Sequence, residues 1–127
     1  DSYQVFAFLD GAQMADSYKN AQIVVARAGA ATLSELAAFR LPSVVCPYPH
    51  AYANHQYHNA KEFGSFGATE IIVQDDIHPA ELEMRLCEWL DDPKRIQTAA
   101  TALAEWDMPN ASERIFELIQ FAFDSKK

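Results

Sequence analysis

The chain is poor in cysteine, glycine and basic residues. Its 127 residues include two cysteines, four glycines, and ten lysines and arginines against eighteen aspartates and glutamates, so the net charge is −8. This acidic balance argues against a broad surface for nucleic acids or anionic membranes, although a few local groups could still hold a small anion. Cys46 and Cys87 lie far apart, the first in an apolar run and the second in a helical one, which indicates buried free thiols and a reducing, cytoplasmic setting.

Long apolar runs and the common catalytic signatures are also missing. No run approaches the roughly 18 apolar residues of a membrane span, and the N-terminus lacks the basic and apolar regions of a signal peptide. The chain has no Walker loop, no GxGxxG pattern, no nucleophile elbow and no paired carboxylates in a pocket-like context. The sequence therefore contains no complete catalytic apparatus, and no cofactor is expected.

What the chain does contain is an alternation of strand-like and helix-like segments, with 50% apolar residues. The expected strands are 3–9, 22–27, 42–49 and 69–74. Residues 10–21 are expected to form a loop and a short helix, and 53–67 a helix that ends near Gly64. Further helices are expected at 31–40, 79–90, 92–105 and 110–123, the last capped by Asn110 and Glu113. The continuous apolar runs 22–27 and 42–49 are typical of strands buried on both faces. This order predicts an α/β fold with a parallel sheet, in a single domain over 1–127.

Ligands of such sheets bind outside the carboxyl ends of the strands. A cation, a glycine and a carboxylate follow one another there, as Arg27, Gly29 and Glu35. Gly29 would let the backbone turn sharply and approach a ligand, and the free amides of the next helix would suit a phosphate. Those amides belong to Ala30, Ala31 and Thr32. The alternative is structural: Thr32 and Glu35 match a capping box, and Arg27 could pair with an acid.

A second polar cluster lies in 47–60. Gln56 and Asn59 are three residues apart, so they share a helix face, and two amides there suit sugar hydroxyls. The alternative is an ordinary polar helix start. His55 and His58 have a spacing that metal ligands can have, but no cysteine or acid completes a zinc set, so no metal is expected.

These two clusters together resemble a known family. The stretch ARAGAATLSELAAFRLPSVVCPYPHAYANHQYHNA, residues 26–60, contains Arg-x-Gly-Ala-x-Thr-x-x-Glu, then Pro-Tyr-Pro, then His-Gln-x-x-Asn-Ala. These blocks, in this order, are similar to the carboxy-terminal part of MurG-type UDP-N-acetylglucosamine transferases of glycosyltransferase family 28. The resemblance implies a GT-B enzyme whose Rossmann-like domain, with helices on both faces of the sheet and a helical tail, binds the donor.

The resemblance also implies a role for each matching residue. Glu35 would hold the ribose hydroxyls of UDP, and the amides of the helix start would face the diphosphate or the sugar. Gln56 and Asn59 would bind hydroxyls of N-acetylglucosamine, with His55 beside them. Leu9 would present its backbone to the uracil, and Met14 would pack near the base.

The family's acceptor-binding half and two strands of the donor sheet are not matched. We therefore expect 3–9 to pair beside 22–27 or with another chain. We also expect no catalytic residue in this chain, which alone would be inactive. The expected partners are UDP-N-acetylglucosamine and an acceptor-binding domain, in the same or a separate chain, which would make any membrane contact. Two alternatives remain: the donor-binding subunit of a split transferase of the Alg13 type, or a non-catalytic nucleotide-sugar-binding module.

Overall fold

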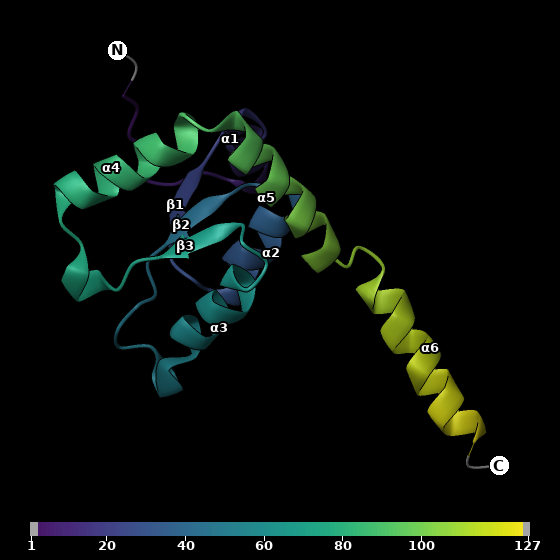
Figure 1. The fold of residues 1–127 in the computed structure, drawn as a ribbon. Helices are drawn as coiled ribbons and strands as arrows, with labels where there is room; N and C mark the ends of the chain where they lie inside the picture. Colours follow the sequence, from purple (N-terminus) through teal and green to yellow (C-terminus); the bar gives the residue numbers. More distant parts are fainter. Residues whose placement is uncertain (1–2, 126–127) are drawn as a thin grey trace.

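A computed structural model describes residues 3–125, and at its centre is a parallel sheet of three short strands (Figure 1). The strands are β1 (Val24–Ala26), β2 (Ser43–Val45) and β3 (Thr69–Ile71), paired in the order β1-β2-β3. Every residue of the central strand β2 is buried. At the edge of the sheet Val25 of β1 is 48% exposed, so the expectation that 22–27 is buried on both faces is wrong. Successive side chains of a strand point to opposite faces of the sheet, so the face of β1 that carries Val25 is only partly covered.

Helices surround the sheet, and most of them match the segments expected from the sequence. They are α1 (Gly11–Asn20), α2 (Ala30–Ala38), η1 (Tyr52–Asn54), α3 (His55–Gly64), η2 (Gln74–Asp76), α4 (Pro79–Leu90), α5 (Pro93–Trp106) and α6 (Ala111–Asp124). Local chemistry explains several of their first residues. A capping box of Asp10 and Gln13 opens α1, and Pro79 and Pro93 open α4 and α5, where a missing amide hydrogen costs nothing.

The helices cover both faces of the sheet. Gly64 of α3 lies against the side chains of Thr69 and Ile71, whereas Glu70 accepts hydrogen bonds from Arg85 of α4 and Arg95 of α5. Successive side chains of a strand point to opposite faces, so α3 and α4 lie on opposite sides of β3. The expected α/β fold with helices on both faces of a parallel sheet is confirmed.

The core is formed where α2, α3, α4 and α5 meet the sheet. Its largest fully buried side chains include Leu36, Val45, Phe63, Trp89 and Leu103. Phe63 of α3 meets the ring of Trp106 edge-on, with the centroids 5.1 Å apart. This aromatic pair therefore attaches α3, the helix that carries the amides of the second polar cluster, to the core.

The expected strand 3–9 is absent. These residues form no strand, and Tyr3, Val5 and Phe8 are 75–90% exposed. Alternating aromatics favour a strand only where a neighbour supplies hydrogen-bond partners for the backbone, and within residues 3–125 β1 pairs with β2 alone. Placement beside 22–27 is thus wrong, and pairing with another chain stays a prediction.

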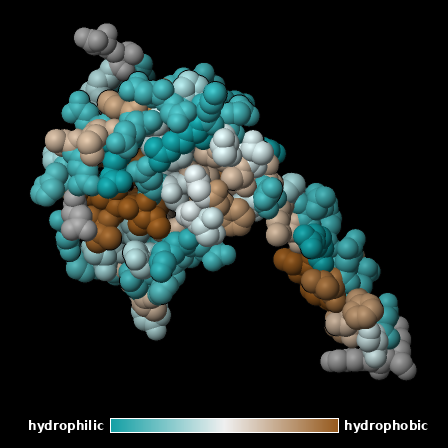
Figure 2. Space-filling model, viewed as in Figure 1, coloured by the Kyte–Doolittle hydropathy of each residue, from teal (hydrophilic) through white to brown (hydrophobic). Residues whose placement is uncertain are grey.

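The last helix, α6, projects away from the rest of the protein (Figure 1). It has no buried residue, and Phe116, Leu118, Phe121 and Phe123 are 59–73% exposed. Figure 2 shows apolar surface on this projecting helix. Asn110 precedes α6 but its side chain makes no capping hydrogen bond, so that expectation is wrong. None of the helices among the described residues has the length and apolar character needed to cross a membrane.

The two cysteines are both free, but they differ in exposure. Cys46 directly follows β2 and is buried, as expected. Cys87 is exposed, because the side of α4 that faces the core is the one that carries Trp89. Only the thiol of Cys46 is therefore a buried thiol.

Candidate functional site

The carboxyl ends of the three strands are held together by Arg27. Its Nη1 donates to the carbonyl oxygens of Cys46 and Pro47 at 3.2 and 3.3 Å, and its Nη2 donates to Oε1 of Gln74 at 2.7 Å. The guanidinium also lies 5.7 Å from the ring centroid of Tyr48. Arg27 pairs with no acid among the described residues, so that structural alternative is wrong. It cross-links the segments after β1, β2 and β3, and it adds a positive charge at the edge where ligands of such sheets bind.

The helix after β1 begins earlier than the sequence pattern predicts. Its N-cap is Gly29, and Thr32 is already the third residue of α2. The capping box of Thr32 and Glu35 is therefore wrong, because a side chain within the first turn cannot serve as the N-cap. No side chain caps the helix, so the amides of Ala30, Ala31 and Thr32 keep their hydrogen-bonding capacity.

Gly29 does not need to be glycine for the sake of the backbone. Its φ of −70° and ψ of 142° are extended values that any residue adopts, so the expected sharp turn at this glycine is wrong. A Cβ built at Gly29 would have Oγ1 of Thr32 as its nearest neighbour, at 3.9 Å. The space beside the free amides is therefore open, which leaves close approach of a ligand as the use of a glycine here.

One turn into α2, the exposed side chain of Glu35 reaches back to α1. Its Oε2 accepts a hydrogen bond from the hydroxyl of Tyr18 at 3.1 Å. Burial, and then the hydrogen bond to Glu35 and its charge, raise the pKa of Tyr18 above the ordinary 10.0. Met14 is half-buried one turn before Tyr18 on the same helix, and Leu9 is half-buried directly before the N-cap of α1. Sequence reasoning missed Tyr18, whose partner lies 17 residues away.

The two amides of α3 tie this helix to the sheet. Oε1 of Gln56 accepts from the backbone N–H of Tyr48 at 3.0 Å, and Nδ2 of Asn59 donates to the carbonyl of Ala28 at 3.3 Å. Within residues 3–125 this leaves Nε2 of Gln56 as a donor and Oδ1 of Asn59 as an acceptor. Next to them His55 opens α3, with Nδ1 2.8 Å from the carbonyl of Tyr52. The helix face can therefore both donate to and accept from hydroxyl groups.

These contacts bring most of the expected site residues to one edge of the sheet. The carbonyl of Ala28, between Arg27 and Gly29, accepts a hydrogen bond from Asn59. The Arg27 guanidinium donates to the segment after β2, and the same segment donates to Gln56. Glu35 lies on the same helix as the free amides and connects them to α1. Leu9, just before α1, and Met14, within it, are connected to this group through the hydrogen bond from α1 to Glu35.

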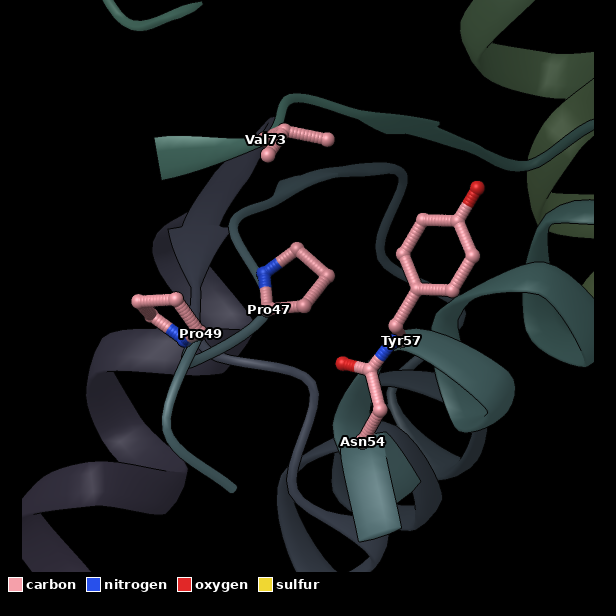
Figure 3. Close-up of a pocket in the computed structure, with 5 residues that line it drawn as sticks. All are labelled: Pro47, Pro49, Asn54, Tyr57 and Val73. Atoms are coloured by element: carbon pink, nitrogen blue, oxygen red, sulfur yellow. The ribbon is translucent and has the colours of Figure 1, made fainter. Parts of the chain in front are cut away.

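A pocket of about 280 Å³ lies beside this group and contains none of the expected residues (Figure 3). It is lined by Pro47, Pro49, Asn54, Tyr57 and Val73, which come from the segments after β2 and β3 and from the start of α3. Ala53 and Asn54 have positive φ values of 49° and 54°, which are uncommon for residues other than glycine. The Pro-Tyr-Pro segment, which supplies Pro47 and Pro49, was the only feature of the sequence that pointed to this pocket. No cluster of three or more metal-binding side chains occurs in the described part of the chain.

Comparison with known proteins gives a consistent result. The family model described as glycosyltransferase family 28 C-terminal domain matches residues 1–115. Similar curated proteins are described as UDP-N-acetylglucosamine–N-acetylmuramyl-(pentapeptide) pyrophosphoryl-undecaprenol N-acetylglucosamine transferases. The protein from Acetivibrio thermocellus is 36% identical over 113 residues, which are 89% of this chain and 31% of the relative. The protein from Oenococcus oeni is 30% identical over 126 residues, 99% of this chain and 33% of the relative.

A solved structure is similar over the same extent. The crystal structure of MurG from Acinetobacter baumannii superposes with a TM-score of 0.78 and 32% identity, covering 92% of this chain and 33% of that one. The chain thus spans about a third of the length of the relatives it matches. The resemblance inferred from the motifs is confirmed, and so is the fold it implied.

Proposed function

Because the chain belongs to the glycosyltransferase family 28 C-terminal domain family, we propose that it binds UDP-N-acetylglucosamine as the donor-binding part of a MurG-type transferase. The observation that carries this proposal is the uncapped start of α2, with free amides beside open space and a carboxylate one turn further on. A diphosphate accepts hydrogen bonds from such amides and is favoured by the helix dipole. A ribose diol donates to a carboxylate through charge-assisted hydrogen bonds.

In this proposal each part of the donor has its own contacts. The diphosphate lies against the amides of Ala30, Ala31 and Thr32, where the positive charge of Arg27 also favours it. The sugar hydroxyls meet the free donor of Gln56 and the free acceptor of Asn59, with His55 beside them. The uracil lies toward Leu9 and Met14 on α1, and Glu35 stands between the base and the phosphates. Residues 1–127 act in it as one donor-binding domain.

The proposed donor site does not include the residues that would bind the acceptor. The relatives' descriptions give an undecaprenol-linked acceptor, and here an acceptor-binding domain would supply that site and any contact with the membrane, on the cytoplasmic side where nucleotide sugars are made. Whether that domain is part of the same chain or a separate subunit does not change the donor site.

The direct test is a titration of the purified chain with UDP-N-acetylglucosamine, UDP-glucose and UDP. We expect all three to bind, and the N-acetylglucosamine donor to bind at least as tightly as UDP. We also expect no transfer by these residues alone, because transfer needs an acceptor held in line with the donor. No binding of any of the three would contradict the donor site, and lipid-linked product formed by the chain alone would contradict the assignment of catalysis to another domain.

A substitution of Glu35 tests the ribose contact. Glu35→Gln should lower the affinity for UDP on the order of tenfold, about 1.4 kcal/mol, because a neutral amide binds a diol less strongly than a carboxylate does. The melting temperature should hardly change, because Glu35 is exposed and does not cap α2. The opposite pattern, in which the melting temperature falls and UDP binds as before, would make Glu35 a structural residue.

A further inference from the structure

Tyr18 forms a hydrogen bond whose partner is the carboxylate proposed to bind ribose. Its hydroxyl lies 3.1 Å from Oε2 of Glu35, and its ring packs against Phe39 with the centroids 5.3 Å apart. The ring is half-buried against the hydrophobic core, so the phenol is held on the α2 side of α1. Glu35, in contrast, is an exposed side chain in the second turn of α2.

We propose that Tyr18 is a positioning residue that fixes the carboxylate of Glu35 in the orientation needed to receive the ribose hydroxyls. This inference rests on the donor site proposed above and adds to it a residue that makes no contact with the nucleotide in that proposal.

An exposed glutamate has three rotatable side-chain bonds, and ordering them when a ligand binds costs conformational entropy. A carboxylate that is already held loses less of this freedom when the ligand arrives, which is how preorganisation increases affinity. Tyr18 can do this because its ring has few rotamers and is fixed against Phe39. The phenol holds Oε2 and leaves Oε1, together with further lone pairs of the carboxylate, for a diol.

The direction of this hydrogen bond is also favourable. A phenol is protonated at neutral pH, so Tyr18 donates and the carboxylate of Glu35 accepts; burial and this contact raise the pKa of Tyr18 further above its ordinary value. The carboxylate of Glu35 is not occupied by helix capping, because the N-cap of α2 is Gly29 and no side chain caps this helix. The carboxylate is therefore available to the phenol on one oxygen and to a ligand on the other.

The same contact links two parts of the proposed donor site. Met14 lies one turn before Tyr18, so the two side chains share a face of α1. A hydrogen bond from α1 to Glu35 thus fixes the helix on the side of the base relative to the carboxylate on the side of the ribose. A purely structural role is the competing explanation, in which the hydrogen bond only attaches α1 to α2.

The two explanations differ in how binding depends on the ribose hydroxyls. The test is Tyr18→Phe in the 127-residue chain, titrated with UDP and with 2′,3′-dideoxy-UDP, which has no diol. We expect about a fivefold loss of affinity for UDP, in the range of one hydrogen bond, and no loss for the dideoxy compound. The ratio of the two affinities within one variant does not depend on the fraction of folded protein. Tyr3→Phe, which removes the same hydroxyl from a side chain that is 90% exposed, should change neither affinity.

Two further variants separate this inference from the proposed function. Glu35→Gln should also lower the affinity for UDP, and the double variant should bind UDP no more weakly than Glu35→Gln alone, because Tyr18 acts only through Glu35. If Glu35→Gln weakens UDP but Tyr18→Phe does not, or if Tyr18→Phe weakens both nucleotides equally, the positioning role is overturned and the ribose contact stands. If Glu35→Gln binds UDP like the native chain, the ribose contact fails and the role of Tyr18 fails with it.

Discussion

Replacing Phe63 with alanine is expected to lower the free energy of unfolding by about 3–5 kcal/mol, the usual cost of removing a fully buried aromatic ring. Phe63 is 0% exposed and meets Trp106 edge-on. Without the ring, α3 loses its main contact with the core, and neighbouring residues fill the cavity only in part. The measurement is chemical denaturation followed by circular dichroism and tryptophan fluorescence.

The chain offers a matched control for this change. Phe116→Ala removes the same ring from α6, where the side chain is 59% exposed and no residue of the helix is buried. It should change the free energy of unfolding by no more than about 0.5 kcal/mol. A loss below about 1 kcal/mol for Phe63→Ala would contradict the packing described for α3, since core aromatic truncations cost several times more.

This stability matters for the site because α3 carries two of its amides. Gln56 and Asn59 are tied to Tyr48 and Ala28 by single hydrogen bonds at 3.0 and 3.3 Å. Bonds of this kind contribute about 1 kcal/mol each, so the packing of Phe63 in the core stabilises the position of the helix more than either bond does. The amides are therefore positioned by a residue that has no part in the proposed binding.

The sequence predicted the helices well because their signals are local. Pro93 at the start of α5 and the period of the apolar residues define a helix without knowledge of the rest of the chain. The strand expected at 3–9 failed for the opposite reason: a strand needs a neighbour, and the sequence of one segment does not reveal whether the neighbour is present. The exposure of Val25 depends likewise on something outside the strand, namely which face of β1 the rest of the chain covers.

The candidate site divides in a similar way. The motif blocks predicted which residues gather at the carboxyl edge of the sheet, but hydrogen-bond partners distant in sequence were not predictable. Arg27 finds backbone carbonyls and Gln74 rather than an acid, and Glu35 finds Tyr18 rather than the start of its own helix. Thr32 and Glu35 are the residue types of a capping box, but they form none, because the N-cap of α2 is Gly29. A shift of one turn changes which residue is the cap and frees Glu35 for another role.

The open N-terminus of α2 gives the site its most severe test, because one substitution should change stability and binding in opposite directions. Gly29→Asp places a carboxylate at an N-cap whose extended backbone already suits that residue. The carboxylate can accept from the free amides and interact with the helix dipole, so stability should rise by about 0.3–1 kcal/mol. The nearest obstacle to the new Cβ is 3.9 Å away, so no strain offsets this gain.

The same carboxylate would occupy the place proposed for the diphosphate and repel its charge. The affinity for UDP should therefore fall on the order of 100-fold, about 2.7 kcal/mol, while the melting temperature rises. Isothermal titration with UDP and a thermal melt of the same sample measure both effects. A purely structural helix start would show only the gain in stability, because capping would then have nothing to displace.

Gly29→Asn is the control that separates charge from occupancy. Asparagine caps a helix about as well as aspartate and has nearly the same shape, but it carries no charge. It should stabilise the chain to a similar degree and weaken UDP by roughly tenfold, about 1.4 kcal/mol, since it competes for the amides without repelling the phosphates. If Gly29→Asp and Gly29→Asn both stabilise the chain and bind UDP like the native protein, the diphosphate does not lie at the start of α2. The proposed ribose contact of Glu35 would then require a nucleotide bound in another orientation, with its diphosphate away from the free amides.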